Sequence, residues 1–296
     1  MQNPNPNNPV TYFHADDYGI TQAQTDLILD CYENGVLNSV SVMPNTDYLP
    51  DALKRLEGTG IRKVCHLNFI EGKSLSDPSK CPLLVDKDGH FCCSFGYLLK
   101  CNFGSPSRRR HLKQQLEREI LAQIKAVFCD DTCISVDSHQ HFLMIPVVLE
   151  AFLSVIADNH YTLSEIRIPT DPLKPLLTTP RVWKYLRPVD VIKWCVLRFL
   201  SLGSRKKLEA YGAAIPVFFG IFFTCHMEHS IVSALLLKYQ KIAAKKNTSL
   251  ELMFHPGAIS STNELLDPNQ QDLVLFYASD DRRKEAMALK ALSKRD

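Results

Sequence analysis

Residues 10–21 read VTYFHADDYGIT, and this stretch gives the first indication of the fold. Its first half is mostly β-branched and aromatic, a composition that predicts a strand over residues 10–15. Thr21 and Gln24 then have the spacing of a capping box, which predicts the start of a helix. That helix is expected to run as far as Asn34. A strand that leads directly into a helix is the repeating unit of α/β proteins.

The same alternation continues along the rest of the chain. Further strands are expected at residues 37–43, 63–69, 133–138, 164–169, 217–223 and 250–255. Further helices are expected at residues 47–57, 107–128, 147–158, 181–202, 230–245 and 280–293. Residues 70–104, rich in Gly, Pro, Ser and Cys, are expected to form a long loop. The pattern therefore predicts an α/β fold, a distorted (β/α) barrel of about seven parallel strands.

Length and composition narrow the class of protein. The 296 residues suit one barrel domain over 11–296 behind a flexible leader at 1–10. A net charge of +2 is too small to indicate a nucleic-acid partner. No window has the roughly 18 uninterrupted apolar residues of a membrane span.

Ten cysteines without a Cys-x-x-Cys pair favour free thiols and a cytoplasmic location. The sequence leaves a homodimer open.

Residues 181–207 form a segment that is both basic and aromatic. We expect it to pack its Trp and Leu side chains on the domain while its charges extend into solvent. Contact with a membrane surface or an acidic partner is the alternative.

Polar residues gather where the predicted strands end. They are Asp16 and Asp17 after the first strand, His66 on the third, Asp137, His139 and His141 in DSHQH, and His255 in HPG. The carboxyl edge of a parallel sheet is where α/β proteins build their active sites. These side chains are therefore expected to share one site.

The residue types in this set suit a divalent metal ion. His139 and His141 would lie on one face of an extended chain, because strand side chains alternate. Two histidines and one carboxylate form a ligand set with open positions, suited to zinc or another ion that activates water. Such a cation would also explain how Asp16 and Asp17 lie side by side, although two carboxylates repel each other.

Six motifs resemble, in the same order, those of the YdjC-like carbohydrate deacetylases, a family that includes chitooligosaccharide deacetylases. They are HADDYGIT, NGVLNSVSVMPN, HLNFIEGKSLS, DSHQHF followed by Pro146, IRIP, and ELMFHPG. The resemblance runs from about residue 11 to residue 257. It implies a distorted (β/α) barrel, one divalent ion, Mg²⁺ or Zn²⁺, and hydrolytic removal of acetyl groups from N-acetylated sugars or oligosaccharides.

Residues at positions that match the family's motifs are expected to have the roles known for the family. The resemblance implies that Asp17, His66 and His139 bind the metal ion. It implies that Asp16 is the catalytic base and His255 the acid.

Four further residues are expected to support the ligands or to touch the substrate: His14, Asp137, His141 and Arg167. Asp137 is expected to hold a ligand histidine in the right tautomer. Arg167 is expected to contact sugar hydroxyls, and the loop 70–104 to form a rim over the sugar.

Three residues depart from the family pattern as we expect it. His14 stands where a small polar residue is expected, Leu143 replaces a further histidine, and Cys225 replaces a glycine before His226. These departures keep two other hypotheses open. One is a carbohydrate-binding protein without catalysis on the same fold, and the other is a metal-dependent amidohydrolase that acts on a non-sugar substrate.

Overall fold

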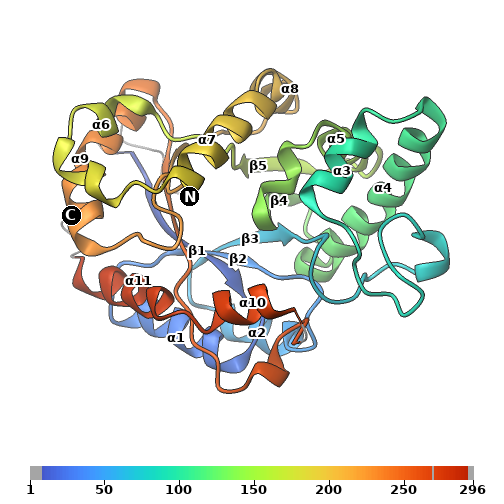
Figure 1. The fold of residues 1–296 in the computed structure, drawn as a ribbon, viewed down its shortest axis with the longest axis horizontal. Helices are drawn as coiled ribbons and strands as arrows, with labels where there is room; N and C mark the ends of the chain where they lie inside the picture. The colour runs from blue at the N-terminus through green and yellow to red at the C-terminus, as the bar shows by residue number, and fades with distance from the viewer. Residues whose placement is uncertain (1–8, 269, 293–296) are drawn as a thin grey trace.

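The structure is a computed structural model that describes residues 9–268 and 270–292. Within these residues, seven parallel strands form one sheet in the order β5-β4-β3-β2-β1-β7-β6 (Figure 1). Their bounds are β1 (Thr11–Tyr18), β2 (Ser39–Val42), β3 (Arg62–Leu67), β4 (Cys133–Ser138), β5 (Thr162–Ile166), β6 (Val217–Phe219) and β7 (Leu250–Phe254). The predicted α/β class and parallel sheet are confirmed.

The two outer strands of the sheet approach each other at one point. A single parallel bridge joins Glu165 of β5 to Ala214, which precedes β6. There the N–H of Ile166 donates to the carbonyl of Ala214, and the N–H of Ala214 donates to the carbonyl of Ser164, both at 3.0 Å. The sheet is therefore a distorted barrel, with β5 and β6 joined by this one bridge.

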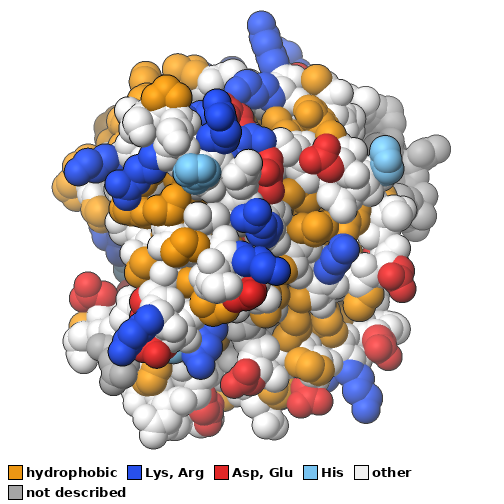
Figure 2. Space-filling view, turned by 90° about the vertical axis from the view of Figure 1, so that its right-hand side faces the viewer, with side chains coloured by type: hydrophobic (Ala, Val, Ile, Leu, Met, Phe, Trp, Pro, Cys, Tyr) orange, Lys and Arg blue, Asp and Glu red, His pale blue; other side chains and the backbone are white. Residues whose placement is uncertain are grey.

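Helices surround the sheet on several sides (Figure 1). In the described residues they are α1 (Gln22–Glu33), α2 (Leu49–Leu56), α3 (Phe95–Asn102), α4 (Pro106–Phe128), α5 (Pro146–Asp158), α6 (Leu173–Leu177), α7 (Pro188–Leu200), α8 (Ser204–Ala210), α9 (His229–Lys246), α10 (Gln271–Tyr277) and α11 (Asp280–Ala291). Helices α3, α4 and α5 group together, and α1 lies beside α11. On the face seen in Figure 2, basic, acidic and hydrophobic side chains are interspersed.

Local sequence patterns account for the regular elements. The predicted helix 107–128 is α4. Apolar side chains that recur every four residues along it, such as Leu112 and Ile120, are buried in the core. At the start of α1, the hydroxyl of Thr21 accepts the N–H of Gln24 at 3.2 Å. At this helix start the side chain of Gln24 does not return to the backbone of Thr21, as a complete capping box requires. Its amide donates to the carbonyl of Asp17 instead.

Several expectations about the elements were wrong. The loop 70–104 contains α3, whose first turn is capped by the hydroxyl of Ser94. The helix expected at 181–202 is divided into a 3₁₀ segment (Pro180–Tyr185) and α7, because Pro188 keeps the residue before it out of helical geometry. Strand β6 is shorter than expected, since the N–H groups that follow it donate to the carboxylate of Asp171. Helices α6, α8 and α10 were not predicted.

Some predictions concern the chain ends and the thiols. Most of the predicted leader, residues 1–8, lies outside the described residues. All ten cysteines fall in the described part, and each is a free thiol. Among the described residues, no helix combines the length and the apolar character needed to cross a bilayer.

Candidate active site

Asp16 and Asp17 lie inside β1, not after its end as expected. The pairing of β1 with β2 changes register between Ala15 and Tyr18, and Asp17 has a φ of +64°. In a regular strand, two adjacent side chains would point to opposite faces of the sheet. A local irregularity of this kind re-aims a side chain, and it brings both buried carboxylates to the same end of the barrel.

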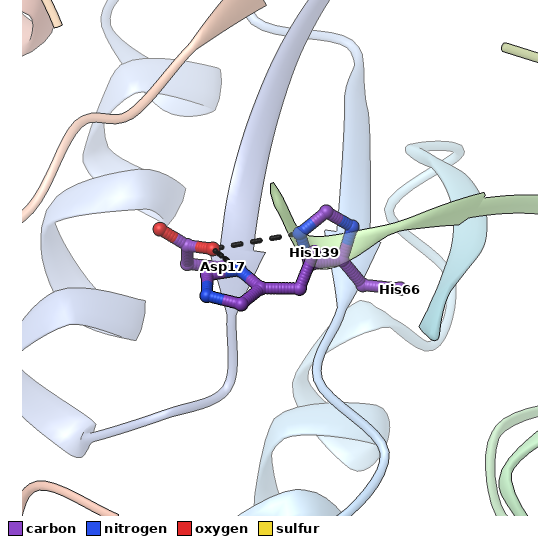
Figure 3. Close-up of side chains that lie close together, drawn as sticks. All are labelled: Asp17, His66 and His139. Carbon is purple, nitrogen blue, oxygen red and sulfur yellow. Dashed lines mark hydrogen bonds and ion pairs between the residues drawn. The ribbon is translucent and has the colours of Figure 1, made fainter. Parts of the chain in front are cut away.

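His66 of β3 and His139, just after β4, face the carboxylate of Asp17 (Figure 3). The Oδ1 atom of Asp17 lies 3.5 Å from Nε2 of His66 and 3.1 Å from Nδ1 of His139. One ligand atom from each of the three residues lies within 4.8 Å of the others, and all three side chains are buried. The fold thus brings together the three residues that the resemblance implies as metal ligands.

Each histidine contacts a second carboxylate through its other ring nitrogen. Nδ1 of His66 lies 2.6 Å from Oδ1 of Asp137, which is its direct neighbour in the register of β3 and β4. Nε2 of His139 lies 2.7 Å from Oε1 of Glu71. Metal-binding histidines characteristically engage an outer carboxylate in this way, which fixes the ring orientation and the tautomer. The arrangement therefore fits a divalent cation.

The buried carboxylates favour positive charge at this position. Burial alone would lower the pKa of His66, but the surrounding acids, Asp137 first, raise it to about 9. Burial acts in the same direction on His139, and the surrounding acids, Glu71 first, raise its pKa to about 10. The acids around the two imidazoles therefore stabilise positive charge at this position.

A second group of candidate ligands, His14, Asp16 and Asp137, already surrounds a cation. The guanidinium of Arg167 donates to both oxygens of Asp16 at 2.7 Å, and its Nη2 lies 2.8 Å from Oδ2 of Asp137. Such a bidentate pair is the strongest form of charged hydrogen bond. Asp17 also pairs with a guanidinium, that of Arg282, but through Oδ2 alone at 3.2 Å, so its Oδ1 still faces His66 and His139. Among the described residues, the cluster around Asp17 is therefore the better position for a metal ion.

The contacts of Arg167 differ from the expected contact with sugar hydroxyls. Its side chain is buried, and its Nε also donates to Glu251 at 2.6 Å. Burial by itself would raise the pKa of Asp16, but the charges of Arg167 and His66 outweigh it and hold that pKa well below its usual value. Arg167 therefore orients Asp16 and keeps it ionised.

The site residues described so far all lie within the part of the chain that one family model matches. A family model described as YdjC-like protein matches residues 11–294. The chain belongs to the YdjC-like family.

Several relatives of this YdjC-like protein carry the name carbohydrate deacetylase. One from Thermoanaerobacter pseudethanolicus is 33% identical over 167 residues, which cover 54% of this chain and 61% of that protein. One from Danio rerio is 28% identical over 161 residues, 53% of this chain and 49% of the relative. One from Xenopus laevis is 25% identical over 276 residues, 84% of this chain and 82% of the relative. The chain thus spans about half to three fifths of the first two relatives.

A solved structure shares the fold. It is described as a cellobiose-phosphate cleavage protein of Enterococcus faecalis, and it superposes with a TM-score of 0.62 at 18% identity. The match covers 97% of this chain and 92% of that one. The distorted barrel of this YdjC-like protein is therefore also found in that protein.

His255 follows β7 and lies beside Asp16. Its Nε2 is 3.8 Å from Oδ2 of Asp16, and its Nδ1 is 3.9 Å from Oε2 of Glu285. Burial lowers the pKa of His255 to about 4 against the opposing charges of Asp16 and Asp17. The imidazole is therefore neutral at neutral pH, so it must gain a proton during a reaction before it can act as an acid.

His14, one of the departures, lies in the polar interior of the barrel. Its Nδ1 is 2.7 Å from the hydroxyl of Ser39, its register partner on β2, and its Nε2 is 2.7 Å from the hydroxyl of Ser41. The same Nε2 lies 3.2 Å from Oδ1 of Asp16. His14 therefore supports the carboxylate of Asp16 and does not merely fill space.

His141 and Leu143 lie where the chain turns after β4. Gln140 and His141 have φ values of +47° and +62°, so the HQH stretch is not extended, and the expectation that His139 and His141 share a face was wrong. His141 lines the pocket beside the implied metal ligands without joining them. Leu143 is buried, and its N–H donates to the hydroxyl of Ser138.

Helix α11 supplies two site residues that sequence reasoning missed. Arg282 is buried, and its Nη1 donates to Oδ2 of Asp17 at 3.2 Å. A Cβ at Gly257 would overlap this guanidinium, which explains the glycine in the HPG motif. Glu285 accepts the backbone N–H groups of Met227 and His255. Arg282 and Glu285 are three residues apart, which places both on the buried face of α11. This spacing is the sequence pattern that could have indicated them.

Glu71 was also missed, because it lies in the segment expected to be a loop. Its two oxygens contact different partners, Nε2 of His139 and the hydroxyl of Tyr277, which donates at 2.9 Å. Glu71 therefore links His139, an implied metal ligand, to the end of α10.

The thiol of Cys225 lines the same pocket, with its Sγ 4.0 Å from Nδ1 of His255. Burial, with a smaller effect of Glu285, raises the pKa of this thiol to about 12, so it stays protonated and is a poor nucleophile. We expect Cys225→Ala to keep kcat within about threefold of the original value, because the protonated thiol performs no chemistry. Steady-state kinetics checks this, and a loss of more than about 10²-fold would assign the thiol a catalytic role.

Proposed function

We propose that this protein is a metal-dependent hydrolase that removes acetyl groups from N-acetylated sugars or oligosaccharides of the chitooligosaccharide type. One observation carries the proposal: two histidines, each backed by an outer carboxylate, converge on Asp17 next to Asp16 and His255. Asp16, His255 and the two histidines border a pocket of about 330 Å³, within the range of small-ligand sites. The name carbohydrate deacetylase of the relatives from Thermoanaerobacter pseudethanolicus and Xenopus laevis supports a sugar as the substrate.

Asp17, His66 and His139 would hold the ion. Two imidazole nitrogens and one carboxylate oxygen favour zinc, whereas magnesium prefers oxygen ligands alone. A bound ion of this kind supplies a Lewis acid that polarises the amide carbonyl and lowers the pKa of water.

The other residues of the site move the protons. Asp16, held in its ionised form by Arg167, accepts a proton from the attacking water, whose oxygen forms the new bond to the carbonyl carbon. His255 lies 3.8 Å from Asp16, so it can receive this proton and pass it to the leaving nitrogen. The carbon–nitrogen bond then breaks, and the products are acetate and a free amino sugar.

Acetate release from N-acetylchitooligosaccharides tests the proposal. We expect activity in the metal-loaded protein, loss of activity after chelation, and recovery when zinc or magnesium is added back. Full activity in a chelated, metal-free sample would contradict the role of the metal. Sugar binding without turnover would favour the carbohydrate-binding hypothesis. Turnover of non-sugar acetamides alone would favour the other amidohydrolase.

Glu71→Gln tests the outer carboxylate. The change removes the charge that orients His139, so we expect metal affinity to fall by about 10- to 100-fold. Titration of the apo protein with zinc measures this affinity without reference to activity. Glu57→Gln, at an exposed glutamate, is the matched control and should leave it unchanged. Equal affinities in both variants would mean that Glu71 does not support the metal site.

A further inference from the structure

Helix α7 exposes an apolar face to solvent. Four of its residues, spaced by three, four and three, have exposed fractions between 41% and 70%: Val189, Ile192, Val196 and Phe199. This spacing places them along one side of the helix. Leu202, just after the helix, is 62% exposed. Contiguous exposed apolar side chains of this kind mark a contact surface.

Only the inner side of α7 packs on the domain. Leu197 is buried, and the indole of Trp194 stacks on the ring of Phe222 at 5.3 Å. The expectation that residues 181–207 pack their Trp and Leu side chains on the domain therefore holds for this inner side alone. Figure 1 shows α7 and α8 projecting together from one edge of the molecule.

The segment that carries this face is strongly basic. Residues 187–211 contain six cations and two acids, whereas the whole chain has a net charge of +2. Both acids pair inside the segment, Asp190 with Arg187 and Glu209 with Arg205. Among the described residues, no carboxylate lies within ion-pair distance of Arg198, Lys206 or Lys207.

A cationic hollow of about 570 Å³ adjoins the apolar face. Arg198, Arg205 and Lys206 line it from α7 and α8, and Lys246 lines it from the end of α9. Partial burial and then the charges of Arg205 and Arg198 lower the pKa of Lys246, so these cations are close enough to repel one another. The acid in the hollow, Asp171, is already engaged by backbone N–H groups at the end of β6. A bound anion would relieve this repulsion.

We propose that α7 and the adjoining hollow dock on the surface of an anionic lipid bilayer. An apolar helix face bordered by cations matches the interfacial helices that lie in the plane of a membrane, with their cations against lipid phosphates. A second copy of the chain fits less well, because a two-fold contact would set these cations against themselves. Lys193 of the same helix lines the active-site pocket, so docking would hold that pocket close to the bilayer.

Co-sedimentation of the full-length protein with vesicles tests this proposal independently of any catalysis. We expect binding to vesicles of phosphatidylglycerol and phosphatidylcholine, weakening with salt, and little binding to phosphatidylcholine alone. The double variant Ile192→Glu, Phe199→Glu should lower the affinity by at least about tenfold. Leu237→Glu on α9, at a residue 61% exposed, is the matched control and should bind like the original protein. Circular dichroism checks that all three proteins are folded.

Three results would overturn the proposal. One is the absence of binding to phosphatidylglycerol vesicles at low salt, and another is equal binding by the double variant and the control. The third is a dimer in sedimentation equilibrium that Phe199→Glu dissociates, which would assign the face to a second copy.

Discussion

Asp16→Asn is expected to lower kcat by at least about 10²-fold, the lower range for loss of a general base. The amide keeps the size of the side chain but cannot accept the proton of the attacking water. Arg167 retains two of its three carboxylates, Asp137 and Glu251, so the barrel interior should stay intact. Acetate release under saturating substrate measures kcat, and the bound metal is measured on the same sample.

The metal content separates this role from a structural one. The implied ligands Asp17, His66 and His139 are unchanged in the variant, so the bound metal should equal that of the original protein. Asp47→Asn, at an exposed aspartate, is the control for an acid-to-amide change and should leave kcat unaffected. If Asp16→Asn kept the original kcat, Asp16 would not be the base.

Arg167→Met is expected to lower the free energy of unfolding by about 3–5 kcal/mol, the range for breaking a buried ion pair from one side. Methionine fills much of the same space but leaves Asp16, Asp137 and Glu251 buried without their shared cation. Urea denaturation monitored by fluorescence measures the loss.

An exposed arginine provides the comparison for this second prediction. Arg181→Met removes the same charge at the surface and should change stability by less than about 0.5 kcal/mol. Equal stability of the two variants would show that the carboxylates around Arg167 do not depend on it. A large loss of kcat in Arg167→Lys, which keeps the charge but not the bidentate geometry, would further support its role in orienting Asp16.

Both predictions follow from the polar interior of the barrel, which strand patterns alone did not reveal. Arg62 contacts Glu165 at 3.0 Å and Glu251 at 3.1 Å, and Arg167 contacts the other oxygen of Glu251. Two arginines and their acids thus connect the middle of the barrel to Asp16.

Much of the candidate site could nevertheless be predicted from sequence. Asp17, His66 and His139 lie near the carboxyl ends of predicted strands, and parallel strands bring those ends together. Asp137 was assigned to a ligand histidine, and it is the register neighbour of His66. Glu71 could not be assigned in this way, because it lies on no regular element and reaches His139 only through the fold.

The sequence by itself determined the α/β alternation, the parallel sheet and the edge of the sheet where the chemistry gathers. Those features follow from hydrophobic periodicity and turn residues, which act over a few neighbouring positions. Only the tertiary structure decided that Arg167 pairs with Asp16, that α11 brings Arg282 to Asp17, and that α7 leaves an apolar face exposed. Ion pairs and exposed faces depend on which distant segments meet, and no local pattern records that.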